Sequence, residues 1–339
     1  MHSNQFPYPI GLLLFNRPEY SIQLLKSLAN QTIKPSDIYI HIDGYKNSRD
    51  ELFGRPNFQD LTISYINSNF PFAHVVIETE NQGIARSWTT LEDLVFKNCH
   101  TRYSQFFESD VLLSKFYLEL TLKLINKYGN LPKIGAISLA GSNSRLEFKR
   151  DSLVNSWGTK AIALNRDHYL ERRPLLDQYL ASIHGVPYWQ RDSEKIINNF
   201  REKNLYLNGS SQDHFKIGLL KYFDKLQIST FESYIKDLGR FGFSREIKKD
   251  LDDLSGLDLD LDFGSKPDEV KSQLNVPLLT REFSLGFHSA IYEKRGYIPS
   301  NVPISYKIII KLRSKFKKSR WLLSFLRKLR KFERNIRAS

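Results

Sequence analysis

The stretch IGLLLFNRPE, residues 10–19, decides the fold of this chain. Its first six residues form a short continuous apolar run, which is typical of a central parallel strand with both faces covered. A helix start follows at once, because Asn16 is a capping residue type, Pro18 is tolerated in a first turn, and Glu19 follows the cap by three residues. We therefore predict a strand and then a helix over about 17–30, which would bury Ile22, Leu24, Leu25 and Leu28.

The same alternation of strand and helix continues along the chain. Strand patterns occur at 37–43, where isoleucines alternate, at 74–78 and at 103–107, and an amphipathic helix pattern covers 83–98. Strands that alternate with helices predict a mostly parallel sheet with right-handed crossovers, so the expected fold class is α/β. The second half predicts a strand at 134–141, a strand, turn and helix start at 156–174, and a helix at 210–223 capped by Ser210 or Ser211.

Charged residues follow three of the predicted strands. Arg17 comes after the first, Asp43 after the second, and Glu108 and Asp110 after the fourth. In open sheets of this kind, ligands bind beyond the carboxyl ends of the strands, so we expect these side chains to meet in one crevice. A carboxylate pair with substrate phosphates is a typical site for Mg²⁺ or Mn²⁺. Each residue taken alone also has a structural interpretation, such as a turn beside Gly44 or a solvated first turn, and only the joint pattern points to a site.

The formal net charge of +13 is concentrated in one segment. Residues 307–337 contain thirteen Lys or Arg and one acid, whereas residues 1–306 contain 37 basic and 36 acidic residues. A nearly neutral body lacks the broad basic surface that nucleic-acid binding uses. The basic charge is therefore a property of the tail.

Within this tail, apolar residues recur every three or four positions with basic residues between them. This predicts an amphipathic helix with the composition of an interfacial membrane anchor, in which each basic residue adds about 1 kcal/mol near an anionic surface. A helix packed on the body and a nucleic-acid-binding segment are the alternatives. We expect residues 1–300 to form the main α/β domain and 301–339 a basic helical tail that binds an anionic membrane rather than nucleic acid. The apolar positions are Leu322, Phe325, Leu326, Leu329, Phe332 and Ile336.

Cysteine usage and the N-terminus bear on the expected location. The single cysteine, Cys99, excludes an intrachain disulfide and fits a reducing compartment. Residues 1–15 lack the basic region of a signal peptide, and no run of about 18 apolar residues occurs to form a spanning helix. We expect a cytoplasmic protein held peripherally at the inner face of the cell membrane.

Seven segments, taken in order, resemble the GT-A glycosyltransferases, most closely the bacterial family-2-like proteins related to the N-acetylglucosaminyltransferase I type. The resemblance covers about residues 8–295 and implies a Rossmann-like GT-A fold with a nucleotide-sugar-binding half, 1–130, and an acceptor-binding half, 131–300. The segments are FNRPEY…LLKSLANQ, IHIDGYKN, NQGIARSWTTLEDLVF, FFESDVLLSKFYLE, SWGTKAIAL, SQDHF and SLGFHSAIY.

The resemblance also implies roles for individual residues. Arg17 and Asp43 would hold the nucleotide, Glu108 would be the first acid of the acidic motif, and Asp110 its metal-binding last acid. Ser109 replaces the middle acid, which in the family helps with the ribose. Further residues implied in the site are Asn81 and Arg86 near the nucleotide sugar, Trp157 at the donor-sugar wall, Asp213 as the base, and His288 near the metal and diphosphate.

Together these residues imply a metal-dependent, inverting glycosyltransferase that uses Mn²⁺ or Mg²⁺. It would move a sugar from a nucleotide-diphosphate sugar to a hydroxyl of a glycan or lipid-linked acceptor, in the assembly of cell-surface polysaccharide or lipid-linked glycan. One alternative is a nucleotidyltransferase, although FNRPEY lacks the glycines that such enzymes place after the first strand. The other is a non-catalytic membrane-surface or nucleic-acid-binding module on the same fold, which Ser109 and the tail leave open.

Overall fold

The computed structural model describes residues 5–46, 56–141, 153–155, 159–186, 190–230 and 233–238, with the backbone alone at 56–58 and 153–155. All of them belong to one unit of the chain, Met1–Asn275. The basic tail, Trp157 and His288 lie outside the described residues, so what was expected of them stays a prediction.

The largest sheet of the described residues has eight strands, and four of them form a parallel block that the first half of the chain supplies. The strand order is β5 (His74–Ile77), β4 (Ile38–Ile42), β2 (Ile10–Leu14), β6 (Tyr103–Glu108), β10 (Ala161–Asn165), β8 (Ile134–Ser138), β11 (Leu226–Thr230) and β9 (Leu153–Asn155). The pair β8 and β11 is also parallel, which confirms a mostly parallel α/β sheet. Strand β10 departs from that pattern, because it runs antiparallel to both β6 and β8.

Two short pairings accompany this sheet. Strand β1 (Gln5–Phe6) pairs with β3 (Lys34–Pro35), and β7 (Val111–Leu113) pairs antiparallel with β12 (Ile235–Asp237). The second pairing joins a late segment of the chain to the residues that directly follow Asp110. A backbone hydrogen bond of 2.8 Å from the Leu238 N–H to the Asp110 carbonyl continues this contact. The sequence patterns did not predict either strand of this pair.

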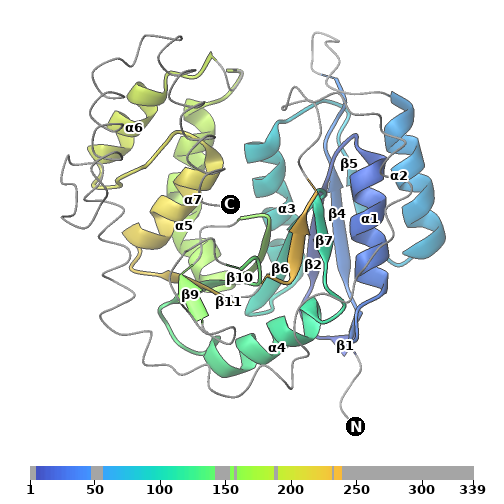
Figure 1. Cartoon of the computed structure of the whole chain (residues 1–339). Helices are drawn as coiled ribbons and strands as arrows, with labels where there is room; N and C mark the ends of the chain where they lie inside the picture. Colours follow the sequence, from blue (N-terminus) through green and yellow to red (C-terminus); the bar gives the residue numbers. More distant parts are fainter. Residues whose placement is uncertain are drawn as a thin grey trace, which may run out of the picture. The chain divides into compact units, whose positions relative to one another are not determined.

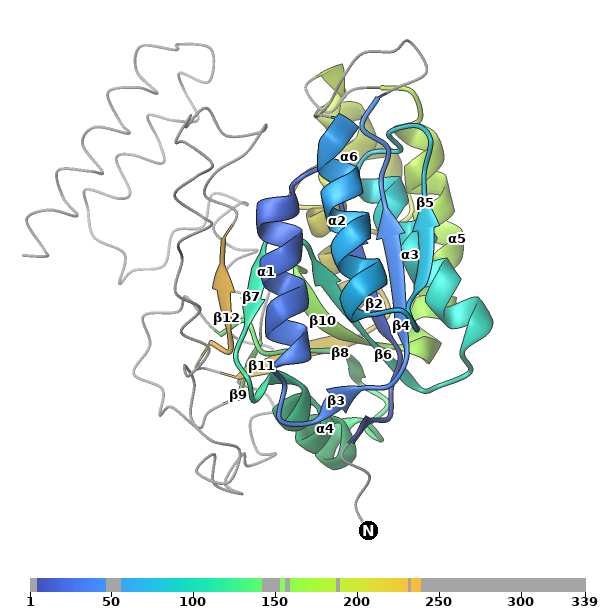
Figure 2. The ribbon, with the colours of Figure 1, turned by 90° about the vertical axis from the view of Figure 1, so that its right-hand side faces the viewer.

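Helices cover both faces of the parallel block. Helices α1 (Pro18–Ala29) and α2 (Pro56–Asn69) lie on one face, and α3 (Ile84–Asn98) and α5 (Arg166–Ser182) lie on the other (Figures 1 and 2). Within the described part of the chain, no helix combines the length and hydrophobicity needed to cross a membrane. The remaining helices are α4 (Tyr117–Tyr128), α6 (Ser193–Arg201) and α7 (Gln212–Tyr222).

The predicted first helix is present, but its cap differs from the expectation. Leu24, Leu25 and Leu28 are buried as predicted, and Ile22 is partly buried. The residue before the first helical position is Arg17 rather than Asn16, and the Arg17 side chain makes no capping hydrogen bond. A residue that precedes proline is sterically disfavoured in the helical conformation, so Pro18 starts the helix and Arg17 stays outside it, with φ of −140° and ψ of 75°. This start leaves the Arg17 side chain beside the strand ends.

The core packs α3 against the parallel strands. Trp88 and Phe106 are fully buried and meet edge to face, with their ring centroids 5.9 Å apart. A Cβ at Gly11 of β2 would lie 2.6 Å from the Phe106 ring, so this strand needs glycine to let the ring approach. A second cluster of buried apolar side chains from α5, α6 and α7 includes Tyr179 and Phe215, whose rings stack with centroids 4.3 Å apart. It holds α7 against the rest of the unit.

Candidate active site

The carboxyl ends of β2, β4 and β6 meet at one edge of the sheet. Leu14 pairs with Ile42, and Leu13 pairs with Glu108, so the three strands end at the same level. The residues that follow these ends include Arg17, Asp43 and the segment Glu108–Asp110. The structure therefore places four of the predicted site residues along this edge.

Arg17 contacts the acidic motif directly. Its Nη2 donates a hydrogen bond of 3.1 Å to the Ser109 hydroxyl and lies 4.0 Å from Oδ2 of Asp110. The guanidinium also lies 5.0 Å from the centroid of the Tyr20 ring, which limits its freedom. Arg17 side-chain exposure is 27%, so this cation is positioned by the protein while still open to a ligand. Ser109 serves here as the acceptor that orients it.

Lys160 is a site residue that sequence reasoning missed. Its Nζ lies 2.9 Å from Oδ2 of Asp110 and 2.9 Å from Oδ1 of Asp237. Burial lowers the pKa of Lys160, but the charge of Asp110 and the hydrogen bonds to both carboxylates outweigh it, so the pKa is raised and the ammonium stays charged. The sequence patterns carried no signal for it, because Lys160 reaches this edge only if the strand that follows it runs antiparallel to β6, and periodicity does not record strand direction.

Glu108 is partly buried beside these charges. Its backbone N–H donates to the Lys160 carbonyl at 2.8 Å, which fixes the end of β6 against the start of β10. Burial, together with the nearby charges of Asp110 and Asp213, raises the pKa of the Glu108 carboxyl to about 7. At neutral pH this group therefore exchanges a proton readily, as acid–base groups in catalytic sites do.

Asp213 belongs to the same electrostatic cluster although it comes from the second half of the chain. It lies in the first turn of α7, which Ser211 caps by accepting a hydrogen bond from the His214 N–H. The Thr159 hydroxyl donates a hydrogen bond of 2.6 Å to Oδ1 of Asp213. Since Thr159 precedes Lys160, the turn before β10 links the candidate base to the acidic motif. The prediction of a capped helix here is confirmed, with Ser211 as the cap.

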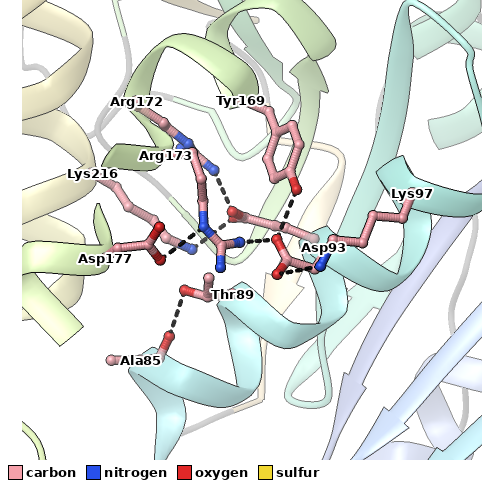
Figure 3. Close-up of polar contacts among 10 residues, drawn as sticks. Ala85, Thr89, Asp93, Lys97, Tyr169, Arg172, Arg173, Asp177 and Lys216 are labelled. Carbon is pink, nitrogen blue, oxygen red and sulfur yellow. Dashed lines mark hydrogen bonds and ion pairs between the residues drawn. The ribbon is translucent and has the colours of Figure 1, made fainter. Parts of the chain in front are cut away.

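A buried charge cluster anchors α7 through Lys216, one turn after Asp213. The Glu92 carboxylate on α3 forms ion pairs with Arg172 Nη2 of α5 at 2.6 Å and with Lys216 Nζ of α7 at 2.8 Å. All three side chains are almost fully buried. Figure 3 shows Arg172 and Lys216 converging between these helices, with Asp93, Tyr169 and Arg173 forming an adjoining set of contacts. Lys216 also lies 4.6 Å from the centroid of the Trp88 ring. Burial lowers the pKa of Lys216 to about 8, against the opposing charge of Glu92.

Asp43 anchors a neighbouring loop. Its carboxylate accepts hydrogen bonds from the backbone N–H groups of Gly44, Gln82 and Gly83 and from the Asn81 side chain, at 2.7–3.1 Å. These four donors match the roughly four lone-pair positions of a carboxylate, so Asp43 is committed to holding the loop in this conformation. Burial raises the pKa of Asp43 although these hydrogen bonds oppose the shift.

The remaining predicted donor-site residues are held by protein contacts of their own. Asn81 donates its Nδ2 to the Gly44 carbonyl at 2.9 Å as well as to Asp43. Arg86, in the first turn of α3, lies with Nη2 2.8 Å from Nδ1 of His184. The structure thus places Asn81 beside Asp43 and pairs Arg86 with His184, and their contacts with a nucleotide sugar stay predictions.

The carboxylates at the edge are suited to a cation. Among the described residues, no group of three or more His, Cys, Asp or Glu side chains is arranged to hold a metal ion. Asp110 and Asp237 nevertheless converge on one cation, the Lys160 ammonium, and Oδ1 of the buried Asp110 has no hydrogen-bond partner in the described part of the chain. Mg²⁺ and similar ions are commonly held by one or two carboxylates plus substrate phosphates, so these two residues fit such an ion.

Comparisons with known proteins find similarity only among solved structures. No protein-family model matches the chain, and no curated protein matches its sequence. The mannosyltransferase PcManGT from Pyrobaculum calidifontis, in complex with GDP-Man and Mn²⁺, is 15% identical over 50% of this chain and 47% of its own, with a TM-score of 0.36. S. aureus TarS 1-349 is 13% identical over 69% of this chain and 60% of its own, with a TM-score of 0.39. In complex with UDP-GlcNAc, TarS 1-349 is 12% identical over 70% of this chain and 59% of its own, with a TM-score of 0.40.

The chain therefore spans about half to three fifths of the length of these structures. Similarity at this level leaves the function to be argued from the residues of the site.

Proposed function

We propose that the chain is a glycosyltransferase that moves a sugar from a nucleotide-diphosphate sugar to an acceptor hydroxyl, with inversion at the anomeric carbon. The observation that carries the proposal is the meeting of Arg17, the Glu108–Asp110 segment and Asp213 at one edge of the sheet. These residues come from distant parts of the sequence, and they match the motifs on which the resemblance to GT-A glycosyltransferases rests.

The leaving group determines what the site must supply. When the bond between the anomeric carbon and the diphosphate breaks, its electron pair stays on the diphosphate oxygen and negative charge develops there. The Arg17 guanidinium, which Ser109 and Tyr20 hold in place, is positioned to stabilise that charge. A divalent cation bound at Asp110 would add neutralising charge at the same diphosphate.

The acceptor must lose a proton as its oxygen attacks. Asp213 is proposed as the base that takes this proton, with Thr159 holding one carboxylate oxygen and thereby orienting the other. Attack from the face opposite the diphosphate inverts the anomeric centre. The acceptor would be a glycan or lipid-linked molecule, and the tail at 307–337 would hold the enzyme at the anionic inner face of the membrane.

Donor binding and turnover test this proposal separately. Purified full-length protein is titrated calorimetrically with UDP- and GDP-sugars in the presence of Mn²⁺, and the sugar that binds is then used to measure hydrolysis and transfer. Arg17→Met should weaken donor binding, because it removes the partly exposed guanidinium proposed to contact the diphosphate. Asp213→Asn should bind the donor normally but turn over about 10²–10⁴-fold more slowly.

Lys133→Met serves as the control, since Lys133 pairs only with the exposed Asp224 at 3.1 Å among the described contacts. If no nucleotide sugar binds, the proposed function is wrong. If Asp213→Asn turns over at the wild-type rate, the assignment of Asp213 as the base is wrong.

A further inference from the structure

The position of Lys160 raises a question about how a cation reaches Asp110. A site intended for a divalent ion should leave its carboxylates available, yet the ammonium lies 2.9 Å from Asp110 and 2.9 Å from Asp237. The other oxygen of Asp110 is buried without a hydrogen-bond partner among the described residues. Lys160 therefore lies at the point where two carboxylates from distant parts of the described chain, Asp110 and Asp237, converge.

The backbone holds these two carboxylates in relation to each other. Asp237 pairs with Val111 in the antiparallel pairing of β7 and β12, and the hydrogen bond from Leu238 to the Asp110 carbonyl lies next to it. Strand pairing fixes backbone positions more firmly than a surface ion pair does. The arrangement of Asp110 and Asp237 is thus a property of the fold, and Lys160 is the mobile member, because a lysine side chain has four rotatable carbon–carbon bonds.

The partial exposure of Lys160 gives its ammonium room to move. The Lys160 side chain is 28% exposed and the Asp237 side chain 51%, whereas that of Asp110 is 11% exposed. An ammonium has three N–H donors, and the two carboxylates use two of them within the described part of the chain. Lys160 can therefore turn outward toward a phosphate oxygen without leaving the edge of the sheet.

We propose that Asp237 is a second carboxylate of the cation site, and that the Lys160 ammonium fills this site until a divalent cation displaces it. This inference rests on the proposed function, because the nucleotide diphosphate would bring the remaining oxygen ligands. It assigns Lys160 a regulatory role: the lysine prevents Asp110 and Asp237 from repelling each other in the metal-free protein, and it competes with the metal. Once displaced, Lys160 becomes an additional donor for the diphosphate.

Metal binding in the absence of donor tests this competition directly. Full-length protein is titrated with Mn²⁺ alone, and free Mn²⁺ is followed by electron paramagnetic resonance. Lys160→Met removes the competitor, so Mn²⁺ affinity should rise about tenfold or more, which corresponds to about 1.4 kcal/mol. Lys160→Arg keeps the positive charge and should leave the affinity near that of the wild type. Lys133→Met should change nothing.

Asp237→Asn tests whether Asp237 is a ligand of the cation. It should lower Mn²⁺ affinity about tenfold in the Lys160→Met background, where the lysine no longer complicates the comparison. Unchanged Mn²⁺ affinity in Lys160→Met, with circular dichroism showing a folded protein, would overturn the inference. Equal affinities with and without Asp237 in that background would do the same.

The two proposals fail in different ways. Mn²⁺ binding that responds to Lys160 and Asp237, without any nucleotide-sugar binding, would support the cation site and contradict the proposed function. Nucleotide-sugar binding of equal strength with Mn²⁺ and with a chelator, in both wild type and Lys160→Met, would support the donor site and overturn the competition.

Discussion

Replacing Glu92 with glutamine should destabilise the protein strongly, because the Glu92 carboxylate lies between the Arg172 guanidinium and the Lys216 ammonium in the buried charge cluster. Its two oxygens accept hydrogen bonds from these two cations, and all three side chains are almost fully buried. Glu92→Gln keeps the shape of the side chain but removes its charge. Breaking a buried ion pair from one side typically costs about 3–5 kcal/mol.

The structure also limits this cost. Arg172 cannot release its proton, but Lys216 can, since burial already lowers its pKa to about 8. Neutralising a lysine whose unfolded pKa is about 10.4 costs at most about 4.6 kcal/mol at pH 7. We therefore expect Glu92→Gln to lower the free energy of unfolding by about 3–5 kcal/mol at pH 7.

The pH dependence gives a sharper signature. The pKa of Lys216 is lower in the folded protein than in the unfolded chain, so the unfolded chain binds more protons between the two values and stability rises with pH. Without Glu92 the folded pKa should fall below 7, and stability should then rise by about 1.4 kcal/mol between pH 7 and 8. In the wild type, whose folded Lys216 pKa of about 8 lies at the upper end of this interval, the lysine stays mostly charged and the rise is several-fold smaller. The destabilisation should thus shrink by about 1 kcal/mol.

Urea denaturation at both pH values, followed by tryptophan fluorescence and circular dichroism, measures these differences. The matched control is Asp224→Asn, which removes an acid from an exposed pair with Lys133 and should stay within about 0.5 kcal/mol of the wild type. A Glu92→Gln protein as stable as the wild type would refute the argument that the buried cations depend on this carboxylate. A destabilisation that is the same at pH 7 and 8 would refute the proton release by Lys216.

Two further changes test other parts of the molecule. Asp43→Asn leaves two of the four donors to this carboxylate, three from the 81–83 loop and one from Gly44, facing an amide NH₂ group. Unfolding should become easier by about 2–4 kcal/mol, with faster hydrogen exchange at Gln82 and Gly83; normal protection of these amides would contradict the anchoring role. Deletion of residues 307–339 removes thirteen basic residues and should abolish sedimentation with anionic liposomes. Added salt should weaken the sedimentation of the undeleted chain with the same liposomes. Equal sedimentation of the two proteins would count against the membrane anchor.

The parallel half of the fold could be predicted from the sequence because its signals are local. Apolar runs such as residues 10–15 must be covered on both faces, and the Pro18 and Ser211 helix starts depend on a few adjacent residues. The direction of β10 could not be predicted in this way. Whether a buried strand runs parallel or antiparallel to its neighbour depends on the path of the chain, which periodicity does not record.

The same distinction between parallel and antiparallel strands separates the site residues that could be predicted from those that could not. Arg17 and the acidic motif follow parallel strands, so their meeting was predictable from the rule for carboxyl ends. Lys160 was missed because it precedes an antiparallel strand, and Asp237 because β12 has only three residues and no apolar pattern of its own. For Asp43 the expected contact with the nucleotide stays a prediction, while its hydrogen bonds from Gly44 and from residues 81–83 favour the structural interpretation that the sequence left open.

The antiparallel pairing of β10 with β6 has a consequence for synthesis on the ribosome. Until residues 161–165 emerge, the backbone groups of β6 that face β10 have no partner strand, so β6 is an unprotected edge of the sheet. Pairing with β10 removes this site of self-association. The pairing of β10 with β6 also brings Lys160 next to Asp110, so the growing chain covers this strand edge and neutralises Asp110 in the same step.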